Sequence, residues 1–350
     1  MKGTNKIIQL VPNLPPTVDG LGDYAFNLAL EFSQKGTETI FISTGGEKIN
    51  QFETHLIGFD GQDLINAVLK TKVNRLFLNY VPYSYQKRGV PFWLLQALTQ
   101  LVKQHGIQLF IYFHELNASG KIYQSSFWLK PLQQLIYKQL QKLASFSFCS
   151  NQTIFNILEA NLPNGRLLKI EIFSNIPEPI TTIHWKEREN TAVIFGSHPN
   201  RMAVYRYENE MNRLIQSLGI TTIIDIGPGT VTENNLNLPI ISKGKLSGSE
   251  VAQLLSTSKW GFINYNDILL EKSGIFAAYA AHGLAVINVN PQRYDLEKPL
   301  HNNFHYKIAS TDEDNNLDGQ LLSKNLYDWY QSHTLKIHAA KIHAVLEQYQ

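Results

Sequence analysis

Cysteine is almost missing from this sequence of 350 residues, in which Cys149 is the only one. A lone cysteine excludes an internal disulfide and a zinc site built from cysteines, and it is typical of proteins from reducing compartments. Histidines at metal-binding spacing are also missing, apart from His301 and His305, which stand beside Pro299 without further ligand residues. We therefore expect a cytoplasmic protein with no metal site.

An excess of one charge is lacking as well, since 31 basic and 29 acidic residues give a net charge of +2. Proteins that hold nucleic acid through its phosphates carry a surplus of cations, so we expect no nucleic-acid partner, although an average over the whole chain can hide a local basic patch. Long apolar runs are absent too. The stretch from Gly274 to Val289 is interrupted by His282 and Gly283, whereas a membrane span needs about 20 apolar residues. The run from Met1 to Leu10 is too short for a signal peptide.

The sequence does contain enough apolar material for a folded core. Hydrophobic residues make up 43% and charged residues 17%, a composition typical of globular proteins. At about 150 residues per domain, the length predicts two domains or one large one. Short apolar runs alternate with segments of helical period, which is the pattern of βα units around a parallel sheet. We expect an α/β protein.

The expected strands fall into two series. The first contains Lys6–Val11, Thr39–Ser43, Leu76–Leu78, Gln108–Phe113 and Ser145–Cys149. The second contains Ala192–Phe195, Thr222–Ile226, Ile240–Ile241, Gly261–Ile263 and Ala285–Val289. A linker rich in proline, Asn175-Ile176-Pro177-Glu178-Pro179, separates them. We therefore expect Rossmann-like domains at residues 1–175 and 190–316, followed by helices at 317–350.

Two motifs of the first half stand beyond strand ends, where parallel sheets bind ligands. Gly20-Leu21-Gly22 opens a helix, and glycines there let a phosphate approach free backbone amides. An ordinary turn with Asp23 as helix cap explains the same residues. His114 and Glu115 follow the strand Gln108–Phe113 and can hydrogen-bond a sugar, act as a base, or serve as a structural cap.

Residues 74–151 contain eight basic residues and one acid, Glu115. Aromatic residues between Tyr80 and Trp128 are interleaved with them. This mixture suits sugars, anionic acceptors or a lipid headgroup surface, although a solvated helix face over a packed core gives the same pattern. If a membrane is involved, the residues that we expect to touch it are Lys87, Arg88 and Trp93.

The second half offers three candidate phosphate contacts. Arg201 and Arg206 follow a strand, and a guanidinium beyond a strand end suits a pyrophosphate. Gly227-Pro228-Gly229 forms a tight loop after the next strand. Lys272-Ser273-Gly274 begins a helix of small residues, where the ammonium, the hydroxyl and the free amides suit phosphate charge. A capped, buried helix explains this last motif equally well.

Taken in order along the chain, these motifs resemble those of GT-B glycosyltransferases, especially the large retaining group that acts on nucleotide sugars (glycosyltransferase family 4-like, group 1). The resemblance covers nearly the whole chain and includes Gly283-Leu284-Ala285-Val286. It implies that Gly20 and Gly22 face the donor phosphate and the acceptor, and that His114 contacts the transferred sugar. It also implies that Arg201 and Arg206 clamp the pyrophosphate, that helices 317–350 pack back on the N-terminal half, and that no cofactor is tightly bound.

The chain departs from that group at its two glutamates, which are normally separated by seven residues. The second position holds Ala278 and the first falls on Leu270, with Glu271 one residue out of register. The contact to the donor ribose is therefore missing or supplied elsewhere, and Lys272-Ser273-Gly274 would compensate at the pyrophosphate. Retaining and inverting outcomes both stay open, and an inverting enzyme would use His114, Glu115 or Asp23 as its base.

Two functions follow from the resemblance. In the first, the protein is a glycosyltransferase that moves a sugar from a nucleoside diphosphate to an unidentified sugar, polysaccharide or lipid-linked acceptor. In the second, the lost glutamate marks a non-catalytic nucleotide-sugar-binding or scaffold relative. An epimerase or phosphorylase of the same fold is a further alternative. A lipid-linked acceptor would place the protein at the inner face of a membrane.

Overall fold

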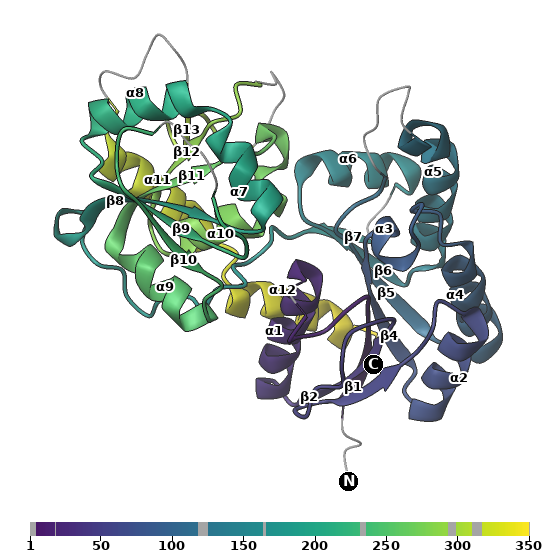
Figure 1. Ribbon diagram of the computed structural model, residues 1–350. Helices are drawn as coiled ribbons and strands as arrows, with labels where there is room; N and C mark the ends of the chain where they lie inside the picture. The colour runs from purple at the N-terminus through teal and green to yellow at the C-terminus, as the bar shows by residue number, and fades with distance from the viewer. Residues whose placement is uncertain are drawn as a thin grey trace. The chain divides into compact units, whose positions relative to one another are not determined.

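The computed structural model describes residues 5–17, 19–117, 125–163, 166–231, 236–292, 299–309 and 317–349. The chain divides into two compact units. Unit 1 comprises Met1–Glu171 and Leu335–Gln350, and unit 2 comprises Ile172–Thr334. Each unit is built around a parallel sheet with helices on both faces (Figure 1). The predicted α/β class with two Rossmann-like halves is confirmed.

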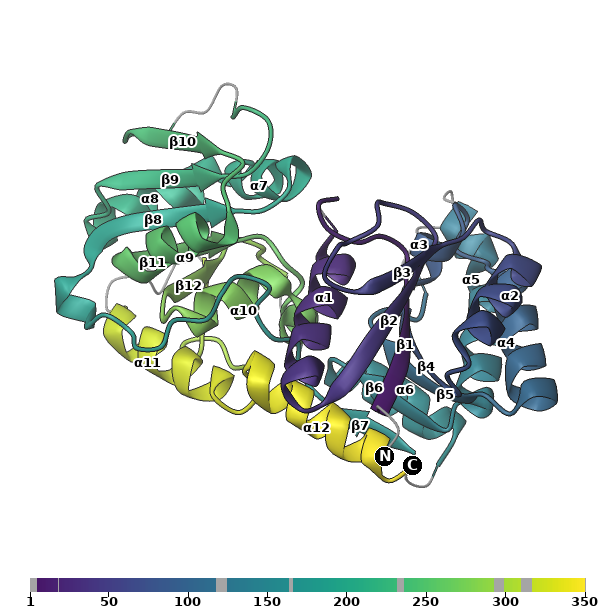
Figure 2. The same cartoon turned by 90° about the horizontal axis from the view of Figure 1, so that it is seen from below.

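The sheet of unit 1 has seven strands in the order β3-β2-β1-β4-β5-β6-β7. The strands are β1 (Asn5–Val11), β2 (Thr37–Ser43), β3 (Glu53–Leu56), β4 (Arg75–Tyr80), β5 (Gln108–Phe113), β6 (Phe146–Cys149) and β7 (Leu167–Lys169). The helices are α1 (Gly20–Gln34), α2 (Gly61–Thr71), α3 (Pro82–Tyr85), α4 (Phe92–His105), α5 (Ser125–Leu143), α6 (Gln152–Asn161) and α12 (Leu335–Glu347). Figure 2 shows α2, α4 and α5 on one face and α1 and α12 on the other.

The two faces of this sheet arise from alternation along its strands. On β4, Leu76, Leu78 and Tyr80 are buried in the hydrophobic cluster that includes α2, α4 and α5. Asn79 points to the opposite face, where its amide donates to Gln9 at 3.3 Å and Gln9 in turn donates to the carbonyl of Ala25 in α1. Polar side chains therefore gather beneath α1, near the carboxyl ends of β4 and β5.

The sheet of unit 2 has six strands in the order β10-β9-β8-β11-β12-β13. The strands are β8 (Glu189–Phe195), β9 (Thr222–Ile226), β10 (Ile240–Gly244), β11 (Ser258–Ile263), β12 (Ala285–Asn288) and β13 (Lys307–Ile308). The helices are η1 (Trp185–Glu187), α7 (His198–Tyr205), α8 (Glu208–Leu218), α9 (Gly248–Thr257), η2 (Asp267–Lys272), α10 (Gly274–Ala281) and α11 (Gly319–Tyr330). One hydrophobic cluster packs α9 and α10 against the sheet, and a second packs α7 and α8.

The unit boundaries differ from the predicted domain boundaries. α11 packs on α10 and β12 of unit 2, with Leu326 and Tyr330 in its cluster, so of the predicted C-terminal helices only α12 lies with unit 1. The segment after Ile172 belongs to unit 2 and is no free linker, because the amide of Ser174 donates to the hydroxyl of Tyr330 at 2.7 Å. In the part of the chain that the structure describes, no helix is long and apolar enough to cross a bilayer.

Candidate functional site

The central strand β8 of unit 2 pairs with β9 on one side and β11 on the other. The chain adds β9 and β10 on one side of β8 and then β11 to β13 on the other. Open α/β sheets bind ligands beyond the carboxyl ends of the strands where the strand order switches in this way. The loop after β8 begins at Gly196 and the loop after β9 begins at Gly227. These two loops, together with the start of α10, form the candidate site of unit 2.

Close backbone approach explains both glycines. Gly227 has φ +149°, and a Cβ atom there would stand 2.0 Å from the carbonyl oxygen of Gly196. Gly196 has φ +134°, and its Cβ atom would meet the Cδ1 atom of Ile275 at 2.7 Å. The β8 loop therefore touches both the β9 loop and the first turn of α10, and the structure brings the predicted Gly227 and Ser273–Gly274 motifs to one place.

Arg201 is fully buried, with 0% of its surface exposed. Its guanidinium donates to the carbonyls of Gly196 at 3.1 Å, of Gly229 at 2.9 Å, and of Pro228, and it forms an ion pair with Asp225. Its N–H groups are thus directed at internal acceptors. Arg201 therefore joins the two glycine loops. This geometry does not support the expected direct contact between Arg201 and a pyrophosphate.

Asp225 completes this buried cluster and was not identified from the sequence. Its second carboxylate oxygen accepts from the hydroxyl of Tyr205 at 3.0 Å. Burial raises the pKa of Asp225, although the hydrogen bond from Tyr205 and the guanidinium of Arg201 act in the opposite direction. Burial also raises the pKa of Tyr205. The sequence did contain a sign of this cluster, because Asp225 stands near the end of the apolar strand Thr222–Ile226. A carboxylate that is buried with such a strand needs a hydrogen-bonding or charged partner.

The start of α10 is open. Ser273 is the N-cap and accepts from the amide of Phe276 at 3.3 Å. A Cβ atom at Gly274 would meet no other atom within 4 Å, and Lys272 is half-buried directly before the cap. Backbone amides of a helix start, free space and an ammonium group are the elements of an anion site.

The positions of the two family glutamates face the core. Ala278 has 0% of its surface exposed, Leu270 has 1% and Glu271 has 4%. The carbonyl of Glu271 accepts from the amide of Ile172 at 3.3 Å. The remaining predicted cation, Arg206, is exposed at the end of α7.

In unit 1 the predicted glycine turn forms the first residues of α1. The N-cap is Asp19, which accepts from the amide of Leu21 at 3.1 Å, whereas Asp23 lies in the first helical turn and is half-buried. Gly22 packs against the β1 loop, since a Cβ atom there would stand 2.5 Å from the carbonyl oxygen of Asn13. Gly20 is exposed. Close packing against the β1 loop therefore explains why residue 22 is glycine, without any ligand.

His114 lies at the carboxyl end of β5, with 7% of its surface exposed. Its Nε2 atom is 3.3 Å from the Oδ1 atom of Asn79. Its ring stands 4.4 Å from the ring of Tyr112 and meets Tyr24 edge-on at 4.8 Å, measured between centroids. This burial counts against a direct sugar contact, which stays a prediction. Glu115 beside it is half-buried, and residues 118–120, which follow shortly after it, lie outside the described residues.

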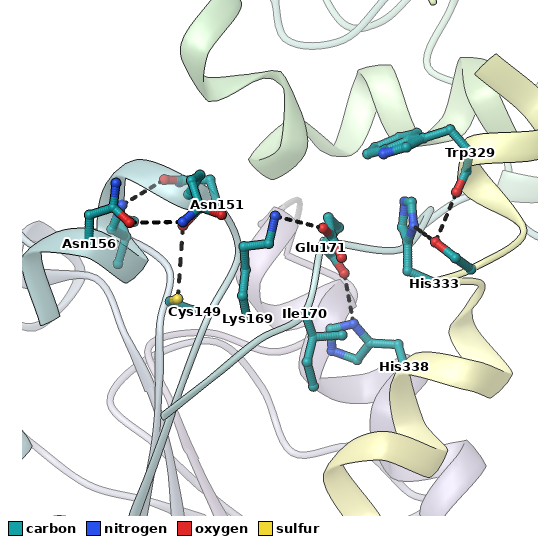
Figure 3. A network of polar contacts seen from close by, with 12 residues as sticks. Cys149, Asn151, Asn156, Lys169, Ile170, Glu171, Trp329, His333 and His338 are labelled. Atoms are coloured by element: carbon teal, nitrogen blue, oxygen red, sulfur yellow. Dashed lines mark hydrogen bonds and ion pairs between the residues drawn. The ribbon is translucent and has the colours of Figure 1, made fainter. Parts of the chain in front are cut away.

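The aromatic cluster around His114 extends to α12. The hydroxyl of Tyr24 is 2.7 Å from Nε2 of His338, whose Nδ1 atom is 2.9 Å from the carbonyl oxygen of Glu171. Figure 3 shows His338 reaching Glu171, whose carboxylate also receives Lys169 at 3.0 Å. The last helix is thus tied to the last residue of the first segment of unit 1. The contact between Tyr24 and His338 could not be predicted from the sequence, because the two residues are 314 positions apart.

A small pocket of about 430 Å³ lies near the end of β4, lined by Phe59, Tyr83, Ser84, Tyr85, Gln86, Lys87 and Trp93. Trp93 is half-buried, and its indole donates to the carbonyl of Tyr85 at 3.1 Å. Its ring is 6.2 Å from that of Phe59. Across the described ranges no group of three His, Cys, Asp or Glu side chains is arranged to hold a metal ion.

No protein-family model and no curated protein sequence matches this chain. Solved structures do match its fold. An α-glucosyltransferase in complex with UDP and a 13-mer DNA containing an HMU base aligns at a TM-score of 0.59 and 12% identity, over 97% of this chain and 98% of that chain. MurG from Acinetobacter baumannii aligns at 0.57 and 12%, over 97% and 99%. WaaG, a glycosyltransferase of lipopolysaccharide biosynthesis, aligns at 0.55 and 12%, over 96% and 93%.

One expectation is corrected by these matches. Near-neutral net charge predicted no nucleic-acid partner, yet further structures of the α-glucosyltransferase also contain a 13-mer DNA. Net charge averages over the whole surface and does not report a local basic region, so the exclusion of nucleic acid was wrong. The two parallel sheets and the matches along nearly the whole chain show that this protein has the GT-B glycosyltransferase-like fold.

Proposed function

We propose that this protein transfers a sugar from a nucleoside diphosphate sugar, with UDP as the favoured carrier, and that unit 2 binds the diphosphate at the start of α10. The observation that carries the proposal is the convergence of the Gly196 loop, the Gly227 loop and the open turn at Gly274. The UDP bound by the α-glucosyltransferase neighbours supports the choice of nucleotide.

In this proposal the protein promotes the reaction by stabilising the departing diphosphate. The bond between the sugar C1 atom and the diphosphate oxygen breaks, and its electron pair leaves with the diphosphate. The oxygen of an acceptor hydroxyl bonds to C1, and the hydroxyl proton passes to the leaving diphosphate or to a base of the protein. Negative charge grows on the diphosphate as that bond stretches, and the amides at Gly274, the Ser273 turn and the Lys272 ammonium stabilise it. Arg206 is the second cation proposed for the donor. Arg201 acts indirectly, by keeping Gly196 and Gly227 in place.

Unit 1 supplies the acceptor side of the proposal. Gly20, Gly22 and Asp23 at the start of α1 and His114 with Glu115 at the end of β5 remain the residues proposed to meet the sugar or the acceptor. Acceptor classes to be tested are sugars, polysaccharides, lipid-linked molecules and, given the DNA complexes of the α-glucosyltransferase, nucleic acids.

The experiment is to incubate the protein with a panel of nucleotide sugars and measure release of the nucleoside diphosphate, with and without acceptor mixtures. We expect release from at least one UDP-sugar, and a loss of that release in Lys272→Ala. The second candidate, a non-catalytic nucleotide-sugar-binding relative, rests on the buried Ala278 in the place of a glutamate. It predicts binding of the same sugar nucleotide without release.

A further inference from the structure

Helix α5 of unit 1 carries an exposed apolar stripe. Trp128 has 69% of its surface exposed, Leu132 has 40% and Leu135 has 45%. The spacing of four and three residues puts all three on one side of the helix. Ile136, four residues after Leu132, and Leu140 are buried in the core of unit 1, so the stripe lies at the border between the buried and the exposed side of the helix.

Cations lie on the same helix as the stripe and on a loop packed against that helix. Lys130, Lys138 and Lys142 are exposed on the same helix. The neighbouring loop with Lys87 and Arg88 is fastened to α5 by the buried Gln133, whose amide donates to the hydroxyl of Tyr83 at 3.1 Å and the carbonyl of Arg88 at 3.4 Å. That loop leads into α4, where Phe92 has 39% of its surface exposed.

The same surface has no carboxylates. Neither residues 82–105 nor residues 125–143 contain an aspartate or glutamate. Within the described ranges, none of the five cations above takes part in an ion pair. The segments that carry these cations therefore supply no negative charge of their own, although the whole chain is close to neutral.

We propose that this surface, formed by α3, the start of α4 and α5, docks on an anionic lipid bilayer, with α5 lying in the plane of the interface. An interfacial helix combines an apolar stripe with flanking lysines and arginines, and anionic lipids attract the cations. Tryptophan favours the headgroup level of a membrane. A nucleic acid would satisfy the cations but leave Leu132 and Leu135 in water, which is why we assign lipid as the occupant. Trp128, rather than the half-buried Trp93, is then the inserted indole.

This proposal does not depend on sugar transfer, and its test is co-sedimentation of the full chain with vesicles. Phosphatidylcholine vesicles that contain phosphatidylglycerol are compared with vesicles of phosphatidylcholine alone. We expect binding only to the anionic vesicles. Lys130→Gln with Lys138→Gln should weaken that binding by about fivefold for each lysine removed. Trp128→Ala with Leu132→Ser should weaken it by about tenfold or more, because the apolar insertion is lost.

Matched controls lie in unit 2. Lys243→Gln with Lys245→Gln removes two other exposed lysines, and Ile241→Ser with Leu321→Ser removes two other exposed apolar side chains. Both should bind anionic vesicles as the wild type does, and all four variants should unfold at the wild-type temperature. Equal sedimentation with both kinds of vesicle, or wild-type binding by the α5 variants, would overturn the proposal. So would binding to single-stranded DNA that depends on the lysines but not on Leu132.

A UDP-binding measurement on the same variants separates the two ideas. The α5 positions belong to unit 1, whereas the proposed donor site is built from residues of unit 2, so UDP binding should be unchanged when vesicle binding is lost. If the protein binds anionic vesicles but no nucleotide, the proposed function is wrong and the proposal of a membrane-docking surface is retained.

Discussion

Arg201 and Asp225 form a buried ion pair in unit 2, with 0% and 1% of their side-chain surfaces exposed. The guanidinium also donates to carbonyls of both glycine loops, at Gly196 and Gly229. A charge pair taken out of water is stabilising only when its remaining hydrogen-bonding groups are satisfied. Here those groups are the loops that border the candidate donor site, so the ion pair and the shape of the site depend on each other.

Loss of either partner of this pair should destabilise unit 2. Arg201→Met leaves the Asp225 carboxylate buried without its cation, and breaking a buried pair costs about 3–5 kcal/mol. Urea unfolding measures the loss. Arg206→Met is the matched control, since that side chain is exposed and surface changes stay within about 0.5 kcal/mol. Equal stability of the two variants would show that Arg201 does not hold the loops.

Two glycine substitutions should behave in opposite ways. Gly227→Ala places a methyl group 2.0 Å from the carbonyl oxygen of Gly196 at φ +149°, so we expect a loss of at least about 2 kcal/mol in the free energy of unfolding. Gly274→Ala meets open space and should leave stability unchanged or raise it by about 0.5 kcal/mol. Thermal unfolding of the two variants checks this, and a destabilised Gly274→Ala would disprove the open turn.

Acid should destabilise the protein through buried histidines. Burial and the neighbouring His301 lower the pKa of His305 to about 4, and burial also lowers the pKa values of His282 and His343. An unfolded histidine titrates near pH ~6.5, so the unfolded chain binds more protons as pH falls from about 6.5 towards 4, and stability is lost over that range.

Urea unfolding at about pH 7 and about pH 5 measures this loss. His305→Gln should show a smaller difference between the two values than the wild type. His184→Gln changes an exposed histidine and should retain the full difference. If His305→Gln shows the same pH dependence of stability as the wild type, protonation of His305 does not cause the loss of stability in acid.

His114→Ala tests whether this residue is structural or functional. Removal of the ring leaves a cavity beside Tyr24 and Tyr112 and takes away the contact to Oδ1 of Asn79, so the free energy of unfolding should fall by about 2 kcal/mol. A role at the sugar would in addition lower turnover more than it raises KM for the donor. His105→Ala, at an exposed position of α4, is the control. If His114→Ala keeps wild-type stability but loses turnover, the role of His114 is functional and the buried cluster does not depend on its ring.

Much of the fold could be predicted from the sequence, because buried parallel strands appear as apolar runs. The missed strands β3, β7 and β13 are all at sheet edges and have four residues or fewer, so they carry too little apolar patterning. The candidate site of unit 2 was outlined in part from the sequence. Gly227 and Gly274 were singled out because turns and helix starts have local signatures, whereas the burial of Arg201 depends on Asp225, a partner 24 residues away.

Calorimetric titration of UDP into the wild type and into Gly274→Ala tests the central claim most directly, because the variant changes one methyl group at the proposed diphosphate contact. We predict that UDP binds the wild type and that Gly274→Ala, with wild-type thermal stability, binds it about tenfold or more weakly, as expected when a backbone contact to a phosphate is obstructed. Absence of UDP binding by the wild type, or equal binding by both proteins, would contradict the assignment of unit 2 as the donor-binding unit.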